Sequence, residues 1–156
     1  MLYAVFDWFE LTPLGVAIRD SIWLFPVIES GHLLALSVLG GAVLVVDLRL
    51  LGLGITGKSI DYVRIQARPF FLGALLAMIA TGIPLFLSEA VKCYFSDAFW
   101  VKMVALGLAL GFTFGVKNRL IAGSAGLLRW QRCAMAGSSM ALWLTVAAAG
   151  RWIGFS

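Results

Sequence analysis

The chain has 156 residues, of which 62% are hydrophobic and only 13% are charged, and its mean hydropathy is +0.98. A soluble domain is nearer half apolar and a quarter charged, so this composition excludes an ordinary soluble protein. The net charge of +4 does not predict nucleic-acid binding, because membrane topology explains it better. The length allows about four membrane-spanning helices with short connections.

Four apolar runs predict an all-α integral membrane bundle, up-down-up-down, that forms a single domain over residues 1–156. The first ten residues mix aromatic side chains with Asp7 and Glu10, which is typical of an interfacial segment. Thr12 followed by Pro13 then predicts the start of a short helix. The predicted spans cover about residues 23–46, 69–87, 100–116 and 133–153.

The first predicted span contains the only histidine of the chain, His32, together with the carboxylates of Glu29 and Asp47. At 100° per residue these ionisable side chains share one stripe of the helix. Such groups are costly in hydrocarbon, so they face the protein interior and mark a functional site. The end of this span predicts a helix cap at Gly52 or Gly54.

The third predicted span carries the clearest packing motif, a GxxxGxxxG pattern formed by Gly107, Gly111 and Gly115. Small residues at this spacing let two helix backbones approach closely. The pattern does not say whether the neighbouring helix belongs to the same chain. It therefore predicts either packing within the bundle or a homo-oligomer, or a place within a larger membrane complex.

The basic residues indicate the orientation of the bundle. They concentrate in the two connections after the first and third predicted spans. The positive-inside rule then places both connections in the cytoplasm and both termini outside, which in a bacterium is the periplasm. The second connection, residues 117–132, predicts a short interfacial helix. Glu29 and His32 lie below the periplasmic face in this arrangement.

Several motifs resemble those of a known family. They are IRDS at 18–21, WLFP at 23–26, ESGHLL at 29–34 and DLRLLG at 47–52, with Thr81-Gly82 and residues 99–103 fitting the same pattern. Together they resemble a family of small four-helix bacterial inner-membrane proteins of unknown function. The resemblance implies that fold and location, and it implies no activity.

More loosely, a small bundle with a histidine near the periplasmic end resembles membrane b-type cytochromes. Those usually ligate haem through two histidines on different helices, whereas this chain has only one. This departure excludes a haem held by two histidines of one chain. His32 is still a candidate ligand of haem b, because neutral imidazole binds iron well and the helix face is apolar enough for a porphyrin, and the second ligand must then be of another kind. That ligand is a methionine, His32 of a second copy, or nothing. Met103 is the methionine that we expect at the same depth in the membrane as His32.

Other interpretations of the same residues remain open. His32 is also explained as a neutral imidazole held in a polar pocket. Glu29 and His32, spaced i, i+3, are a metal-ligand pair of the kind found in carboxylate-bridged bundles, with Glu89 and Cys93 as further ligands. Lys102 is expected to reach the interface or to pair with Glu29 or Glu89.

Three functional classes follow from these alternatives. The first is a haem-binding electron-transfer protein, the second a non-catalytic subunit of a membrane complex, and the third a small transporter or proton pathway. The sequence does not decide whether the protein is an enzyme, and it contains no hydrolase, phosphate-loop or nucleic-acid motif. Haem binding leads because, of the three classes, it alone uses the residue that is hardest to explain otherwise, His32.

Overall fold

The computed structural model describes residues 2–122 and 127–154, and within these ranges the secondary structure is helical, without strands. The order is α1 (Leu2–Glu10), α2 (Pro13–Asp20), α3 (Leu24–Leu50), α4 (Ile60–Ser88), α5 (Ala90–Phe95), α6 (Asp97–Gly111), the π-helix η1 (Phe112–Lys117), α7 (Asn118–Ala122) and α8 (Arg129–Ile153). The all-α prediction is confirmed.

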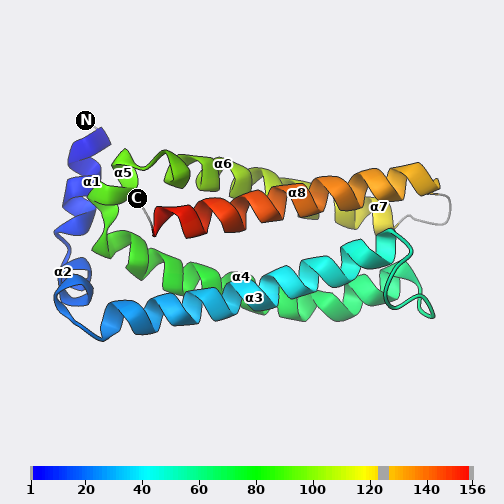
Figure 1. The fold of residues 1–156 in the computed structure, drawn as a ribbon, viewed down its shortest axis with the longest axis horizontal. Coiled ribbons are helices and arrows are strands. Elements are labelled where there is room, and N and C mark those ends of the chain that lie inside the picture. Colours follow the sequence, from blue (N-terminus) through cyan, green and yellow to red (C-terminus); the bar gives the residue numbers. More distant parts are fainter. Residues whose placement is uncertain (1, 123–126, 155–156) are drawn as a thin grey trace.

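Four helical stretches are long and apolar enough to cross a membrane: α3, α4, the stretch 97–122 formed by α6, η1 and α7, and α8. They run alternately up and down along one another (Figure 1). Helix α3 packs against α4 and α8, and α6 packs against α8. Both ends of the chain lie at the same end of the bundle, where α1, α2 and α5 also lie (Figure 1).

All four spanning stretches extend beyond the predicted spans, and α4 and the third stretch do so furthest. Helix α4 begins at Ile60 because the Ser59 hydroxyl caps it, accepting a hydrogen bond from the Tyr62 amide at 3.1 Å. The third spanning stretch continues to Ala122. Lys117, where the second basic connection was predicted to begin, lies on η1 with its side chain buried, and the short helix α7 follows it.

The helix ends follow the local sequence signals. Thr12 caps α2, as predicted, and its hydroxyl accepts a hydrogen bond from the Gly15 amide at 3.3 Å. After α3 the chain turns at Gly52, whose φ of 83° suits glycine. The Leu53 amide donates to the Leu48 carbonyl oxygen at 2.8 Å. This bond is the mark of a Schellman cap, so the predicted cap is confirmed.

The apolar core has two parts. The central part joins α3, α4, α6 and α8 through Leu39, Ala42, Val43, Phe71, Ala74, Ala105, Ala109, Trp143 and Val146. The second lies nearer the end that carries the α3–α4 connection and contains Val46, Leu50, Val63, Ile121, Met135 and Ala136. Many small residues occur in both parts, as expected where membrane helices pack closely.

Helix α2 packs on the end of α4 at Gly15. A Cβ atom at this position would overlap the carbonyl oxygen of Leu87 and lie 3.1 Å from that of Glu10. Since both atoms belong to the backbone, Gly15→Ala is expected to lower the free energy of unfolding by about 1–3 kcal/mol. Denaturant unfolding followed by circular dichroism measures this loss.

The matched control for that substitution is Gly41→Ala. Gly41 lies within α3, is exposed, and has no atom of the described residues within 4 Å of an added Cβ. Alanine favours a helix interior over glycine, so this variant is expected to be neutral or slightly stabilised. Equal losses in the two variants would contradict the close approach of α2 to α4.

Candidate functional site

A partly open pocket lies at the end of the bundle that carries both termini, and we call it the polar chamber because titratable side chains line it among apolar ones. Its volume is about 150 Å³, and it contains most of the titratable side chains predicted to form the site. Glu29 and His32 enter it from α3, Glu89 and Cys93 from the α4–α5 region, and Lys102 from α6. The structure thus brings these five residues together, although they lie up to 73 positions apart in the sequence.

A larger apolar cavity adjoins this chamber. It has a volume of about 340 Å³ and is lined by Leu36, Leu39, Leu75, Met78, Ile79, Ile83, Met103, Leu106, Trp143 and Val146. Five more residues line both spaces: His32, Gly82, Phe86, Phe99 and Lys102. The cavity lies between α4 and α6, which do not pack along each other in the described part of the chain.

His32 is held by a hydrogen bond to α4. Its Nδ1 atom lies 2.8 Å from Thr81 Oγ1. The Thr81 hydroxyl has one proton, which it donates to the Ala77 carbonyl oxygen at 2.7 Å. With the Thr81 proton placed on Ala77, Oγ1 accepts from His32, and on this basis we assign the ring proton to Nδ1.

The position of the ring proton determines which nitrogen of His32 can bind a ligand in the cavity. In the neutral ring, Nε2 carries a lone pair and no proton. The contact with Thr81 is made by Nδ1, and the ring also contacts the Met78 backbone. A histidine whose other nitrogen donates to a fixed oxygen is the arrangement that metal-ligating histidines adopt. This tautomer therefore suits the binding of a metal ion by Nε2 of His32.

Two glycines make room for the side chains of the site. An added Cβ at Gly82 would lie 3.2 Å from His32 Cε1, so a larger residue would press on the imidazole ring. An added Cβ at Gly150 would lie 3.5 Å from Lys102 Nζ. The Lys102 side chain is half-buried and lies beside α8 at this glycine.

The predicted pairing of Lys102 with a carboxylate is not made. No ion pair within the described ranges includes Lys102 or Glu29. Glu89 lies 3.9 Å from Lys92 instead. Lys102 lines both the polar chamber and the apolar cavity.

Cys93 lies on α5, outside the four spanning stretches. Burial, with a smaller contribution from the nearby Glu89 carboxylate, raises the pKa of its thiol to about 11. Since the thiolate is the reactive form, iodoacetamide modification in a Cys133→Ser background should accelerate about tenfold per pH unit up to about pH 10. Mass spectrometry measures this rate, and a plateau near pH 9 would contradict the raised pKa.

A second buried polar cluster lies toward the other end of the bundle. Lys117 on η1 forms an ion pair of 2.5 Å with Asp47 on α3, and its Nζ also donates to Ser139 Oγ on α8 at 3.0 Å. Trp143 Nε1 donates to Thr113 Oγ1 at 3.3 Å. Asp47 is thus interior, as expected, and it links three helices with its partners. Thr113 and Lys117 both lie on the π-helix η1, and π-helical turns are frequent at functional sites.

The three glycines of the GxxxGxxxG motif face outward. Gly107, Gly111 and Gly115 are exposed, and no atom of the described residues lies within 4 Å of an added Cβ at any of them. The close helix approach that the motif indicates is therefore not made within the described part of the chain. A second copy of the chain as its partner stays a prediction.

The predicted metal pair of Glu29 and His32 lines the polar chamber. Among the residues that the structure describes, no group of three or more His, Cys, Asp or Glu side chains is arranged to hold a metal ion. Met103, the expected second haem ligand, lines the apolar cavity together with His32. Met78 lines it as well, although by depth only Met103 was expected there.

Sequence reasoning missed two functional contacts. Thr81 was recognised only as part of a motif, yet its hydroxyl contacts Nδ1 of His32 at 2.8 Å. Lys117 was assigned to a connection, although it pairs with Asp47. The signal for the second contact was a carboxylate inside a span, because such a group needs a cationic partner.

The helices and the polar interior define an integral membrane protein with a four-helix bundle. The chain belongs to the family described as a family of unknown function (DUF6644), which matches residues 5–156. The expected membership of a family of unknown function is therefore confirmed. No curated protein and no solved structure matches the chain.

Proposed function

We propose that the protein binds haem b in the apolar cavity and takes part in electron transfer, with His32 as an axial ligand through Nε2. The observation that carries this proposal is the hydrogen bond between His32 Nδ1 and Thr81, because a ring proton on Nδ1 leaves the lone pair on Nε2 of a side chain that lines the apolar cavity. A neutral imidazole in this state is a good ligand for haem iron.

The residues around the cavity fit this group. Its walls are apolar and aromatic, with Phe86, Phe99 and Trp143 among them, and such walls suit a flat macrocycle. Lys102 at the border of the polar chamber is a positive charge that would pair with the acidic side chains of haem. When bound, haem supplies one-electron transfer.

Two methionines are candidates for the second axial position. Met103 on α6 and Met78 on α4 both line the cavity beside His32. A thioether ligand raises the reduction potential of a haem. His32 of a second copy, or no ligand at all, remains the alternative, and the outward GxxxGxxxG face of α6 is where a second copy would approach.

We further propose that the bundle lies in a bacterial inner membrane with both termini in the periplasm. The support is the concentration of basic residues at the end that carries the α3–α4 connection.

Two other functions predict different properties of the purified protein. A non-catalytic subunit would lack a cofactor and co-purify with a partner, and a transporter or proton pathway would give water access to Glu29.

The test is a haem titration of the purified protein in detergent, comparing wild type with Thr81→Val. Valine keeps the shape of threonine but removes the oxygen that orients His32. Loss of such an orienting partner typically weakens binding by about 10–100-fold. The Soret absorbance during titration gives the dissociation constant of each form.

Thr81→Ser is the matched control, because serine keeps the hydroxyl that accepts from His32 Nδ1. It is expected to bind haem about as tightly as wild type. A wild-type protein that takes up no haem would overturn the proposal. Equal affinities of the valine and serine variants would show that the tautomer of His32 does not matter for binding.

A further inference from the structure

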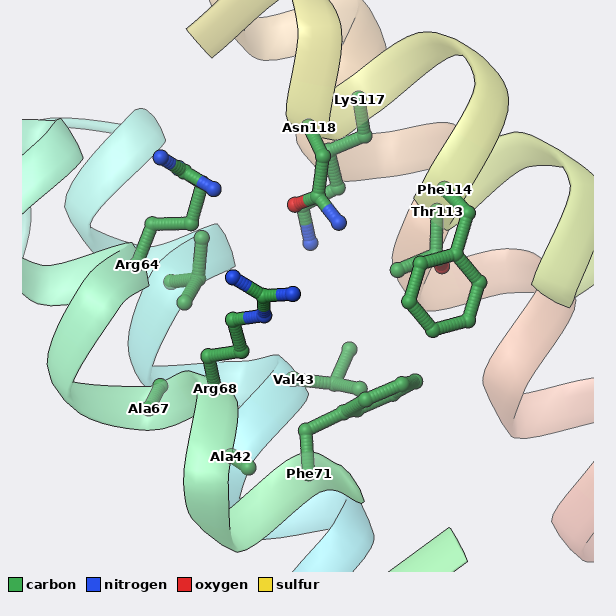
Figure 2. A pocket seen from close by; sticks show the side chains of 11 residues that line it. Ala42, Val43, Arg64, Ala67, Arg68, Phe71, Thr113, Phe114, Lys117 and Asn118 are labelled. Atoms are coloured by element: carbon green, nitrogen blue, oxygen red, sulfur yellow. The ribbon is translucent and has the colours of Figure 1, made fainter. Parts of the chain in front are cut away.

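A basic cleft lies on the opposite half of the bundle from His32. It is formed where α4 faces η1 and the start of α7, and its volume is about 40 Å³. Arg64 and Arg68 enter from α4, and Lys117 and Asn118 from the other wall. Figure 2 shows the polar ends of Arg68, Lys117 and Asn118 pointing into the same space from opposite walls.

The charges around this cleft are not balanced. Lys117 is paired with Asp47 at 2.5 Å, and Arg64 with Asp61 at 2.6 Å. No ion pair among the described residues includes Arg68. The cleft therefore holds one guanidinium without a carboxylate partner, next to two further cations.

The depth of the cleft indicates where its ligand comes from. Arg68 directly precedes the apolar run of residues 69–87, so it marks the border of the hydrocarbon layer. Phe71 and Phe114 line the same cleft, and Phe114 is 42% exposed beside it. Phosphate groups of lipids lie at this border, with their acyl chains along the apolar surface below.

We propose that this cleft binds the phosphate of an anionic phospholipid, with Arg68 as its main contact and Asn118 as an additional donor. Basic pockets between membrane helices on the cytoplasmic side recognise anionic headgroups in this way. The volume of about 40 Å³ is too small for an acyl chain, so the acyl chains remain outside along Phe114. This site is independent of His32 and of haem.

The experiment is native mass spectrometry of the whole chain in detergent, with phosphatidylglycerol and phosphatidylcholine added in turn. Wild type is expected to retain phosphatidylglycerol in preference to phosphatidylcholine. Arg68→Gln should lower the affinity for phosphatidylglycerol about fivefold, which is the usual contribution of one basic residue. Its affinity for phosphatidylcholine should not change.

Arg119→Gln is the matched control, because Arg119 is an exposed arginine on α7 that does not line the cleft. It should leave both affinities unchanged. Equal losses in the two arginine variants, or no preference in wild type, would overturn the proposal. Displacement of phosphatidylglycerol by inorganic phosphate would also overturn it, because the ligand would then be a free anion rather than a lipid.

Discussion

Lys117→Met is expected to lower the free energy of unfolding by about 3–5 kcal/mol, because it leaves the Asp47 carboxylate buried without its charge partner. The side chains of Asp47 and Lys117 are 0% and 4% exposed, so water replaces neither partner. Methionine matches the length of lysine and suits an apolar surrounding. Unfolding in a denaturing detergent, followed by circular dichroism, measures the loss.

Removing the second charge should reverse most of this effect. In the double variant Asp47→Leu with Lys117→Met no charge remains buried, and replacement of a whole buried pair is often neutral. Lys58→Met, at an exposed lysine near the α3–α4 connection, is the control for the substitution itself. A double variant no more stable than Lys117→Met would contradict the ion pair as the cause.

His32→Ala is expected to abolish haem binding, with complete loss of the Soret band. The variant removes the only imidazole of the chain, so no side chain of the same type replaces it. Thr81 keeps its hydrogen bond to Ala77, so the bundle should still fold. Added imidazole should restore the band, because it supplies the missing ligand in the vacated space.

Glu29→Gln is the control for a charge change in the same chamber. Glu29 lines the polar chamber but not the apolar cavity, so this variant should retain haem. If added imidazole restores the Soret band of His32→Ala, that variant has lost the haem ligand and not the fold. A Soret band that survives in His32→Ala would exclude His32 as the ligand.

The long helices could be predicted from the sequence because the membrane imposes their length and hydropathy. Their composition alone identified α3, α4, the third stretch and α8. The predicted spans were shorter than the helices because hydropathy reports the depth in the membrane rather than the end of the hydrogen-bonded helix. Helix α4 thus begins at Ile60 and carries Arg64 and Arg68 on its first turns.

The candidate site could be predicted only in part. A lone histidine in an apolar run identified His32, and helical spacing placed Glu29 beside it. The partner Thr81 lies 49 positions away, and its role depends on how α3 and α4 are aligned along each other. No pattern in a single sequence reports how two helices are aligned. For the same reason the sequence did not predict that Lys117 contacts both Asp47 and Ser139.

The glycine motif shows the limit of interpreting a pattern by itself. The spacing of Gly107, Gly111 and Gly115 indicates a close helix neighbour, but not which helix. In the described chain α8 packs on another face of α6, at Ala105 and Ala109. The direction of a face depends on the packing of the whole bundle, which local spacing does not determine.

The central claim is that His32 ligates haem b, and the most direct measurement is the visible absorption spectrum of the purified wild type. The protein should come from cells with ample haem, and its spectrum should be recorded oxidised and then reduced with dithionite. The account predicts a Soret band and a sharp α-band after reduction. A colourless protein would contradict it, and His32 would then be a buried structural or proton-handling group.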